Sequence, residues 1–448
     1  MSGLFGTDGI RGRVGHSPVR PEDVLKIGWA AGTVLRRQGR GSQIILGKDT
    51  RVSGYLFESL LEAGFIAAGM DTALTGPLPT PAIAHLTTTS RASAGIVISA
   101  SHNPYHDNGI KFFQGNGHKL DDQTEEQIEE LFDQPMITAE QLGKATRFPQ
   151  PAGRYIEFCK HTFPQELSLR DVSVVLDCAN GACYDLAPRV FRELGATVYA
   201  IGIDPDGYNI NRNCGTECTE LLVQTVIDQQ ADIGIAFDGD GDRLRVVDET
   251  GTVLDGDAIL FILSHHRKQS GVLTGGVVGT IMSNHGFERS LQRQGISLHR
   301  TEVGDRYVLE ALQSRGWCLG GEPSGHIVCR DKVTTGDGIV AALEVLHAMQ
   351  FKGTPLSTLI TDLQYSPQAH ANVPMSVAVA DRTAVLREVA VRKTLDEVEA
   401  LLGVEGRVVV RCSGTEPVVR VMVEGQDQCQ VQEYCEQIVT VISGLQIG

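Results

Sequence analysis

Three stretches of the chain repeat one pattern of apolar and polar positions. Each begins with a short Val/Ile-rich run, passes through a polar loop into apolar residues at helical spacing, and ends with a Gly and a second apolar run. The stretches are residues 44–76, 174–202 and 276–304. Short apolar runs bounded by Gly and followed by helical patterns are typical of parallel α/β units. The pattern therefore predicts three related α/β domains in tandem.

The end of the chain follows a different pattern. Residues 365–377 contain two prolines and are typical of a linker. A helix-like segment at 381–403 and two apolar strands, at 407–412 and 418–425, come next. This order predicts a small C-terminal α+β domain. The domain boundaries that we expect are 1–153, 154–256, 257–368 and 369–448.

Length and composition agree with several globular domains. A chain of 448 residues is too long for one hydrophobic core, which stops growing near roughly 250–300 residues. Apolar residues at 42% and charged residues at 21% are ordinary fractions. The 50 Gly among 448 residues are a larger fraction than the usual roughly 7%, which indicates many tight backbone sites. The ten cysteines form no CxxC pair, so we expect small buried hydrophobes rather than a zinc site.

Net charge and hydropathy limit the partners and the location. A formal charge of −16 disfavours nucleic acid or an anionic membrane as the main partner. The start has no leader-like pattern, and no apolar run approaches the roughly 20 residues of a membrane span. We therefore expect a cytoplasmic protein in which locally clustered basic groups hold any anionic ligand.

Three aspartates alternate with glycine in the sequence DGDGDR. In an extended chain Asp238, Asp240 and Asp242 would project to one side. Their mutual repulsion favours a bound cation, and three carboxylate oxygens suit Mg²⁺. An EF-hand is disfavoured because Arg243 stands where its sharp turn needs Gly; a solvated acidic turn stays open.

The stretch VISASHNP, residues 97–104, ends an apolar run with two hydroxyls and an imidazole. Pro104 fixes the local backbone and pushes Asn103 toward an extended conformation. A hydroxyl held rigidly there, as at Ser101, suits acyl or phosphoryl transfer. The G-x-S-x-G elbow of many hydrolases is missing, and an ordinary turn serine is the alternative.

The loop RCSGTEPVVR, residues 411–420, has the composition of a phosphate cradle. It combines two guanidiniums, two hydroxyls and a glycine, and Arg matches phosphate with two parallel hydrogen bonds. A plain hairpin turn is the alternative. The candidate ligands are Arg411, Ser413, Gly414, Thr415 and Arg420.

Basic residues in other Gly-containing loops extend the predicted anion site. They are Arg11, Lys48, Arg51 and Lys111. None belongs to a Walker A loop, so nucleotide is not implied. In GGEPSGHIV, Glu322, Ser324 and His326 form a set suited to the hydroxyls of a polyol.

Together, SASHNP, DGDGDR, GEPSGH and RCSGTEP, in this order and in four successive domains, resemble the α-D-phosphohexomutase superfamily. The stretches at 5–12, 303–310 and 325–346 look most like its bacterial phosphoglucosamine mutase branch. The resemblance covers nearly the whole chain. It implies three tandem α/β domains with mixed sheets plus a C-terminal α+β domain, arranged around a central cleft.

The resemblance also implies roles for individual residues. Ser101 would be the phosphoserine nucleophile, and a phosphoserine oxygen would join the three aspartates in binding one Mg²⁺ per subunit. Arg11 and Lys111 would line the reacting phosphate, with His102 close by. The substrate-binding residues implied are Glu322, Ser324 and nearby His326 for the sugar, and Arg411, Ser413, Gly414, Thr415 and Arg420 for the phosphate that is not transferred.

The implied reaction interconverts glucosamine 6-phosphate and glucosamine 1-phosphate through a 1,6-bisphosphate, feeding UDP-N-acetylglucosamine and peptidoglycan precursor synthesis. Glucosamine or glucose 1,6-bisphosphate would be the activator, and a homodimer is compatible with the resemblance. A phosphoserine brings about −1.5 to −2 charge, which a metal and basic groups would balance. Pro323 and Glu302 depart from the branch pattern. The alternatives are a phosphoglucomutase/phosphomannomutase with the same chemistry and a non-catalytic sugar-phosphate sensor.

Overall fold

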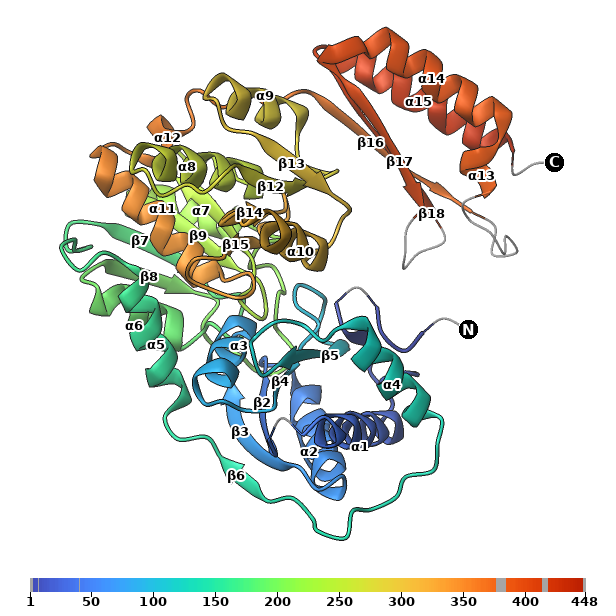
Figure 1. Ribbon diagram of the computed structural model, residues 1–448. Coiled ribbons are helices and arrows are strands. Elements are labelled where there is room, and N and C mark those ends of the chain that lie inside the picture. The colour runs from blue at the N-terminus through green and yellow to red at the C-terminus, as the bar shows by residue number, and fades with distance from the viewer. Residues whose placement is uncertain (1–2, 7, 40, 376–383, 413–417, 446–448) are drawn as a thin grey trace. The chain divides into compact units, whose positions relative to one another are not determined.

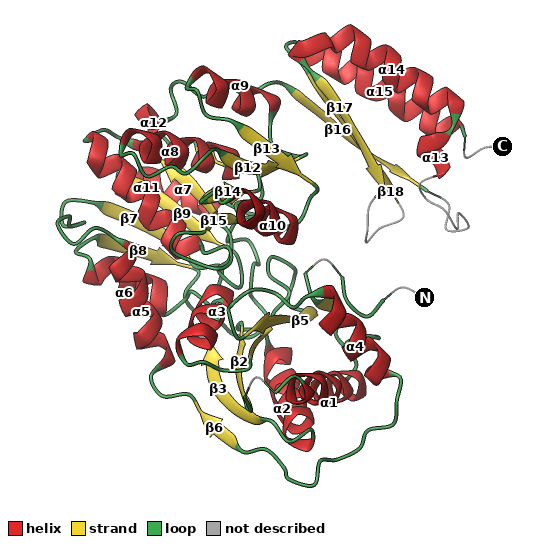
Figure 2. Ribbon diagram, in the orientation of Figure 1, coloured by secondary structure: helices red, strands yellow, loops and turns green. Residues whose placement is uncertain are grey.

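The computed structural model describes residues 3–6, 8–39, 41–375, 384–412 and 418–445 (Figure 1). The chain divides into two compact units. Unit 1 comprises Met1–Thr280 and Leu298–Thr361, and unit 2 comprises Ile281–Ser297 and Asp362–Gly448. Among the described residues, unit 1 has three sheets and unit 2 has one, each accompanied by helices (Figure 2).

The first sheet of unit 1 is mixed. Its strands are β1 (Ile10–Arg13), β2 (Gln43–Lys48), β3 (Asp71–Pro77), β4 (Ala94–Ile98), β5 (Asp107–Gln114) and β6 (Ala145–Arg147), in the order β1-β5-β4-β2-β3-β6. The strands β2, β3, β4 and β6 pair in parallel, whereas β5 is antiparallel to β1 and β4. Parallel strands are covered on both faces, which explains why every residue of β4 is apolar or Gly and buried.

Four helices accompany this sheet: α1 (Pro21–Arg37), α2 (Val52–Ala67), α3 (Thr80–Thr89) and α4 (Asp122–Phe132). The first two approach closely, since a Cβ on Gly64 would lie 2.4 Å from the carbonyl oxygen of Leu25. Their apolar faces join β1, β2 and β4 in one buried core. The helix α3 begins after β3, at an edge that also contributes to the candidate site.

The second and third sheets of unit 1 are also mixed. The second has the order β11-β10-β9-β7-β8, and the third has the order β13-β12-β14-β15. The strands of the second are β7 (Ser173–Asp177), β8 (Thr197–Ile201), β9 (Ile233–Phe237), β10 (Leu244–Asp248) and β11 (Val253–Leu254), and those of the third are β12 (Val277–Thr280), β13 (Leu298–Thr301), β14 (Leu319–Gly321) and β15 (Ile327–Cys329). The remaining helices of unit 1 are α5 (Pro151–Thr162), α6 (Leu186–Glu193), α7 (Glu220–Gln229), α8 (Gly256–Gln269), α10 (Asp305–Arg315), α11 (Gly338–Lys352) and α12 (Leu356–Leu359).

Unit 2 combines one helix from the middle of the chain with the C-terminal segment. Its elements are α9 (His285–Arg293), β16 (Gln368–Pro374), α13 (Ala384–Arg387), α14 (Val389–Leu402), the 3₁₀ turn η1 (Gly403–Glu405), β17 (Arg407–Cys412), β18 (Val418–Glu424) and α15 (Gln428–Gly444). The strands form an antiparallel sheet in the order β16-β18-β17. Apolar side chains of β16, β18, α14 and α15 form its core.

The three repeats are confirmed as strand–helix–strand units: β2-α2-β3, β7-α6-β8 and β12-α9-β13. The linker predicted at residues 365–377 is wrong, because it contains the strand β16. Ala369 and Val373 of this strand are buried. The two prolines are compatible with a strand because Pro367 precedes it and Pro374 ends it, and β16 lies at an edge of the sheet.

Candidate active site

The side chain of Ser101 follows β4 and is fully buried. Its Oγ lies 2.5 Å from Oδ2 of Asp238, and its backbone N–H donates to Oγ of Ser99 at 2.9 Å. Ser99 in turn donates to Asp49 at 2.7 Å. Ser101 has φ +53°, in the left-handed region that non-glycine residues avoid. The two serines thus differ: Ser99 holds the backbone, and Ser101 points its hydroxyl at a carboxylate.

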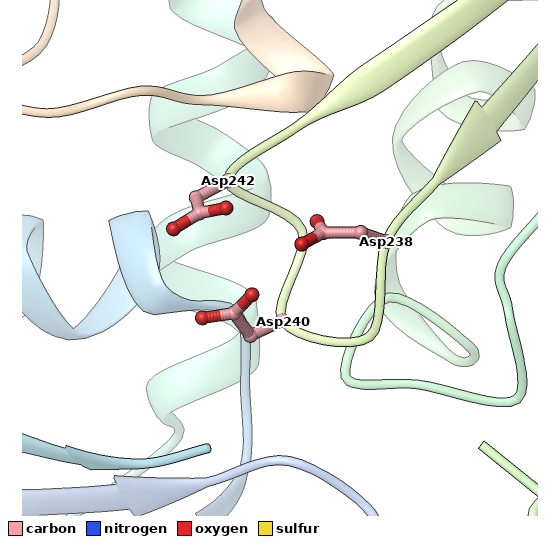
Figure 3. Close-up of side chains that lie close together, drawn as sticks. All are labelled: Asp238, Asp240 and Asp242. Carbon is pink, nitrogen blue, oxygen red and sulfur yellow. The ribbon is translucent and has the colours of Figure 1, made fainter. Parts of the chain in front are cut away.

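The aspartates converge in the loop that joins β9 to β10, residues 238–243, which we call the aspartate loop. Figure 3 shows Asp238, Asp240 and Asp242 directed toward one another. Each offers a carboxylate oxygen, and these oxygens lie within 4.8 Å of one another. The extended backbone expected from the sequence is wrong: Phe237 and Leu244 pair across a hairpin, so a turn gathers the side chains. Strand alternation would have spread them along one face instead.

Lys111 of β5 lies against two of these carboxylates. Its Nζ is 2.7 Å from Oδ2 of Asp240 and 2.8 Å from Oδ2 of Asp242. Burial opposes the charge of the ammonium, but Asp240, Asp242 and Asp8 outweigh burial and raise the pKa of Lys111 well above its usual value. Lys111 is therefore a fixed positive charge among the carboxylates.

The remaining carboxylate oxygens fit a hard divalent cation. Oδ1 of Asp240 and Oδ1 of Asp242 are buried and have no hydrogen-bond partner among the described residues. Burial, followed by the charges of Asp242 and Asp240, raises the pKa of Asp238 well above its usual value. Buried carboxylate oxygens without partners are costly unless a cation coordinates them. The donor set is thus suited to Mg²⁺, with Ser101 at its edge.

A threonine of the first domain holds the aspartate loop. Thr80, at the start of α3, donates from Oγ1 to Oδ2 of Asp240 at 2.5 Å, and its backbone N–H donates to the carbonyl of Asp240 at 2.8 Å. Sequence reasoning missed Thr80, since nothing local distinguishes it from the other threonines of α3.

Further charged groups lie beside the aspartates, and the structure adds members that sequence reasoning missed. Arg11 pairs with Asp8, and Asp8 also accepts from Lys119, which contacts Asp305 at 2.7 Å. Nε of Arg11 and Nε of Arg243 are buried without a hydrogen-bond partner among the described residues. Asp8, Arg243 and Asp305 stand inside the stretches 5–12, 238–243 and 303–310 that the sequence analysis singled out, so they could have been found; Lys119 lies outside these stretches.

His102 lies near the serine hydroxyl, with Nδ1 3.4 Å from Oγ of Ser101. Burial, with the positive charge of Arg243 as the next cause, lowers the pKa of His102 to about 4. The imidazole is therefore neutral at neutral pH, and the distance is at the long limit for a hydrogen bond.

The loop GEPSGH is joined through the backbone to Leu244, the first residue of β10, which directly follows the aspartate loop. The N–H of Leu244 donates to the carbonyl of Gly325 at 3.1 Å. Gly325 has φ +93°, and a Cβ there would lie 2.0 Å from the carbonyl oxygen of Leu244, so this close approach requires glycine. The hydroxyl of Ser324 and both ring nitrogens of His326 lack hydrogen-bond partners among the described residues. Glu322 accepts from the N–H of Gly304 at 3.0 Å.

Two residues of the predicted phosphate cradle are described, and both belong to unit 2. Arg411 of β17 lies directly opposite Arg420 of β18 in the strand register. Both line a pocket of about 210 Å³ within that unit. Ser413, Gly414 and Thr415 lie outside the described residues.

The cysteines of unit 1 are mostly buried, as expected. The buried ones are Cys159, Cys178, Cys183, Cys214, Cys318 and Cys329 in unit 1 and Cys435 in unit 2. Cys429 is exposed, and Cys218 and Cys412 are half-buried. No helix in the described part of the chain is long and apolar enough to cross a membrane.

Comparison with known families matches four successive models along the chain. They are described as phosphoglucomutase/phosphomannomutase alpha/beta/alpha domain I (residues 2–137), domain II (153–251), domain III (255–365) and the C-terminal domain (375–441). The predicted fold class, with three α/β domains and a different C-terminal domain, is confirmed by these matches and by the mixed sheets.

Known proteins resemble the chain over nearly its whole length. A phosphoglucosamine mutase of Thioalkalivibrio sulfidiphilus is 56% identical over 440 residues, which cover 98% of this chain and 97% of the relative. One from an Enterobacter species is 54% identical, with 98% of each chain covered. A phosphoglucomutase/phosphomannomutase family protein of Burkholderia thailandensis is similar in structure, with a TM-score of 0.83, 25% identity and coverage of 99% and 98% of the two chains. An Aspergillus fumigatus N-acetylphosphoglucosamine mutase, solved in complex with GlcNAc-6P and magnesium, has a TM-score of 0.70 at 16% identity, covering 99% of this chain and 96% of that one.

The identities near 55% over almost the full length exceed what fold similarity alone requires. The matched length spans all four family domains. The chain belongs to the phosphoglucosamine mutases of the phosphoglucomutase/phosphomannomutase family.

Proposed function

We propose that this protein interconverts glucosamine 6-phosphate and glucosamine 1-phosphate, with Ser101 as the phosphate carrier. The observation that carries the proposal is the 2.5 Å contact between Oγ of Ser101 and Asp238, one of three aspartates suited to Mg²⁺. The names of the relatives supply the substrate, glucosamine phosphate. The cofactors of the proposal are one Mg²⁺ per subunit and glucosamine or glucose 1,6-bisphosphate as activator.

In the proposed reaction, phosphorylated Ser101 transfers its phosphoryl group to the free hydroxyl at carbon 1. The bond between phosphorus and Oγ breaks, a bond to the sugar oxygen forms, and the hydroxyl proton leaves to a base. The 1,6-bisphosphate then reorients. Ser101 takes the phosphoryl group from carbon 6, and a proton returns to that oxygen, so the cycle leaves glucosamine 1-phosphate and a phosphorylated enzyme.

The residues around Ser101 would position and balance charge in both transfers. A bound Mg²⁺ would supply positive charge to the phosphoryl oxygens, and Asp238, Asp240 and Asp242 would hold it. Arg11, with a buried Nε lacking a partner among the described residues, would donate to the reacting phosphate. Lys111 would keep two aspartates in place. Positioned charge is most of what phosphoryl transfer requires of a protein.

The other candidates complete the proposal. His102 is neutral and near Ser101, so it is our candidate for a proton acceptor. Glu322, Ser324 and His326 would bind sugar hydroxyls. Arg411, Ser413, Gly414, Thr415 and Arg420 would bind the phosphate that is not transferred. We also propose the domain boundaries near 153, 256 and 368, a cytoplasmic location and a homodimer.

Two substitutions test whether Ser101 carries the phosphate. Ser101→Ala is expected to abolish turnover and the gain of one phosphate, measured by intact mass after incubation with glucose 1,6-bisphosphate. Ser99→Ala, the matched control, keeps the hydroxyl of Ser101 and is expected to retain a measurable rate. The reverse ranking would overturn the assignment of Ser101.

A substrate panel tests the sugar. Wild-type protein is assayed with glucosamine 6-phosphate, glucose 6-phosphate and mannose 6-phosphate at equal concentration, and glucosamine 6-phosphate is expected to give the highest kcat/KM. A clear preference for mannose 6-phosphate would assign the protein to the alternative mutase specificity. Turnover of none of them, with Ser101 never phosphorylated, would favour a sugar-phosphate sensor.

A further inference from the structure

The guanidinium of Arg51 lies beneath the loop that contains Ser101, and it is completely buried. The sequence grouped Arg51 with candidate phosphate-binding residues. A fully buried side chain cannot bind a sugar phosphate that enters from solvent, so Arg51 has a different role in this fold.

All five N–H donors of Arg51 are occupied by acceptors of the protein. Nη2 donates to the carbonyl oxygens of Ser101 at 2.9 Å and Asn103 at 2.8 Å. Nη1 donates to the carbonyl of Asp107 at 3.1 Å and also to that of Pro104. Nε donates to Asp49. A guanidinium has five N–H groups, so none is left for a ligand.

The same loop is held from two further directions. Asn211, from the second domain, donates from Nδ2 to the carbonyl of Ser101 at 2.9 Å and to that of Asn103 at 3.1 Å. On the other side of the peptide, the N–H of Ser101 donates to Ser99, whose hydroxyl donates to Oδ2 of Asp49. The same Oδ2 accepts from Nε of Arg51 at 2.8 Å. Arg51 and Asp49 therefore fix both the N–H and the C=O of the Ser101 peptide units.

The contacts of Arg51 and Asp49 constrain the backbone conformation of Ser101. Ser101 has φ +53°, a conformation that is uncommon for residues other than glycine. We propose that Arg51 is a positioning residue, which imposes this backbone conformation and so aims Oγ of Ser101 at the aspartate loop. Its effect on turnover rests on the proposed function; its effect on loop order does not.

The geometry requires arginine rather than positive charge alone. Four carbonyl oxygens, from Ser101, Asn103, Pro104 and Asp107, are reached by one planar group. The ammonium of lysine has three donors and no planar fork, so it keeps the charge beside Asp49 but cannot satisfy the set.

The test compares Arg51→Lys with Arg267→Lys. Arg267 of α8 is also buried and also pairs with carboxylates, Asp331 at 2.8 Å and Glu344 at 2.9 Å. Neither of these partners belongs to the Ser101 loop. Both variants are expected to melt at lower temperature. Only Arg51→Lys should lose kcat, by about 100-fold, as expected when a reacting group is misplaced by about 1 Å, with KM for the sugar phosphate changed less than about threefold.

A second readout does not depend on activity. Hydrogen exchange of the backbone amides at 99–107, measured by mass spectrometry, should accelerate in Arg51→Lys and stay at the wild-type rate in Arg267→Lys. Unchanged exchange in this segment, or a wild-type kcat in Arg51→Lys, would overturn the inference. A wild-type protein without mutase activity would overturn the proposed function, while the exchange measurement would still decide the role of Arg51.

A second variant tests the inference if Arg51→Lys does not fold. Asp49→Asn preserves the shape of the side chain while removing the charge that orients Nε of Arg51. It should show the same accelerated exchange at 99–107 and a smaller loss of kcat. Wild-type exchange and wild-type kcat in Asp49→Asn would contradict the inference.

Discussion

Removal of divalent cation is expected to lower the thermal midpoint of unit 1, because three buried carboxylates share one small site. Their oxygens lie within 4.8 Å of one another. At that separation each like-charge pair costs about 3–4 kcal/mol for an effective dielectric constant of about 20. Lys111 contacts Asp240 and Asp242 and also lies 3.4 Å from Asp8, so its charge is shared among several carboxylates.

The expected magnitude follows from binding linkage. A cation that binds only the folded state, at about 100 times its Kd, stabilises that state by about 2.7 kcal/mol. Unit 1 spans about 340 residues, and an unfolding entropy of about 2.1 cal/mol/K per residue then converts 1 kcal/mol into about 1.4 °C. We therefore expect unit 1 to melt about 4 °C higher in Mg²⁺ than in EDTA.

The assay is differential scanning calorimetry of the full chain in EDTA and in a Mg²⁺ series. The control is Asp240→Asn, which removes one of the three charges and should lose most of the Mg²⁺ dependence. Equal midpoints of the wild-type protein in EDTA and in saturating Mg²⁺ would refute the reasoning. So would a Mg²⁺ shift of undiminished size in Asp240→Asn.

Three further predictions concern single positions. Thr80→Val removes the hydrogen bond to the aspartate loop and should weaken Mg²⁺ binding by about 10- to 100-fold in calorimetric titration, whereas Thr87→Val, the same change in a buried threonine of the same helix, should not. Gly239→Ala places a Cβ 2.5 Å from the carbonyl oxygen of Ser101 and should lower kcat more than tenfold, while Gly153→Ala, with open space around its Cβ, should leave kcat unchanged. Burial raises the pKa of Asp337 to about 6, so the folded state holds this proton more tightly than the unfolded chain does. The free energy of unfolding should therefore fall by about 3 kcal/mol as pH rises from about 4 to about 6. Asp337→Asn should lack this fall when the free energy of unfolding is measured by denaturant titration at pH 4 and at pH 8.

The repeats were predictable because hydrophobic periodicity directly reflects which faces of a strand or helix are buried. The convergence of the aspartates was predicted for the wrong reason, because alternation in DGDGDR matches both an extended strand and a tight hairpin loop. Only the pairing of Phe237 with Leu244 distinguishes the two. The strand β16 was missed because one proline directly precedes it and the other ends it, which are positions that an edge strand tolerates.

Burial separates residues that look equivalent in the sequence. Arg11 and Arg51 are both arginines in Gly-containing loops, and both were candidates for a phosphate. Arg11 keeps a guanidinium nitrogen without a partner among the described residues, whereas Arg51 spends every donor on the protein. That difference depends on long-range contacts, which local composition does not encode.

The loop that contains Ser101 is held by its carbonyl oxygens, and this has a consequence for protein design. The carbonyl groups that Arg51 holds belong to the backbone, so the letters of the motif do not show the groups that anchor it. A designer who transplants SASHNP into another scaffold would copy the visible motif and lose its support, which stands about 50 positions earlier in the chain, at Asp49 and Arg51. The transferable unit is the loop together with that buried pair.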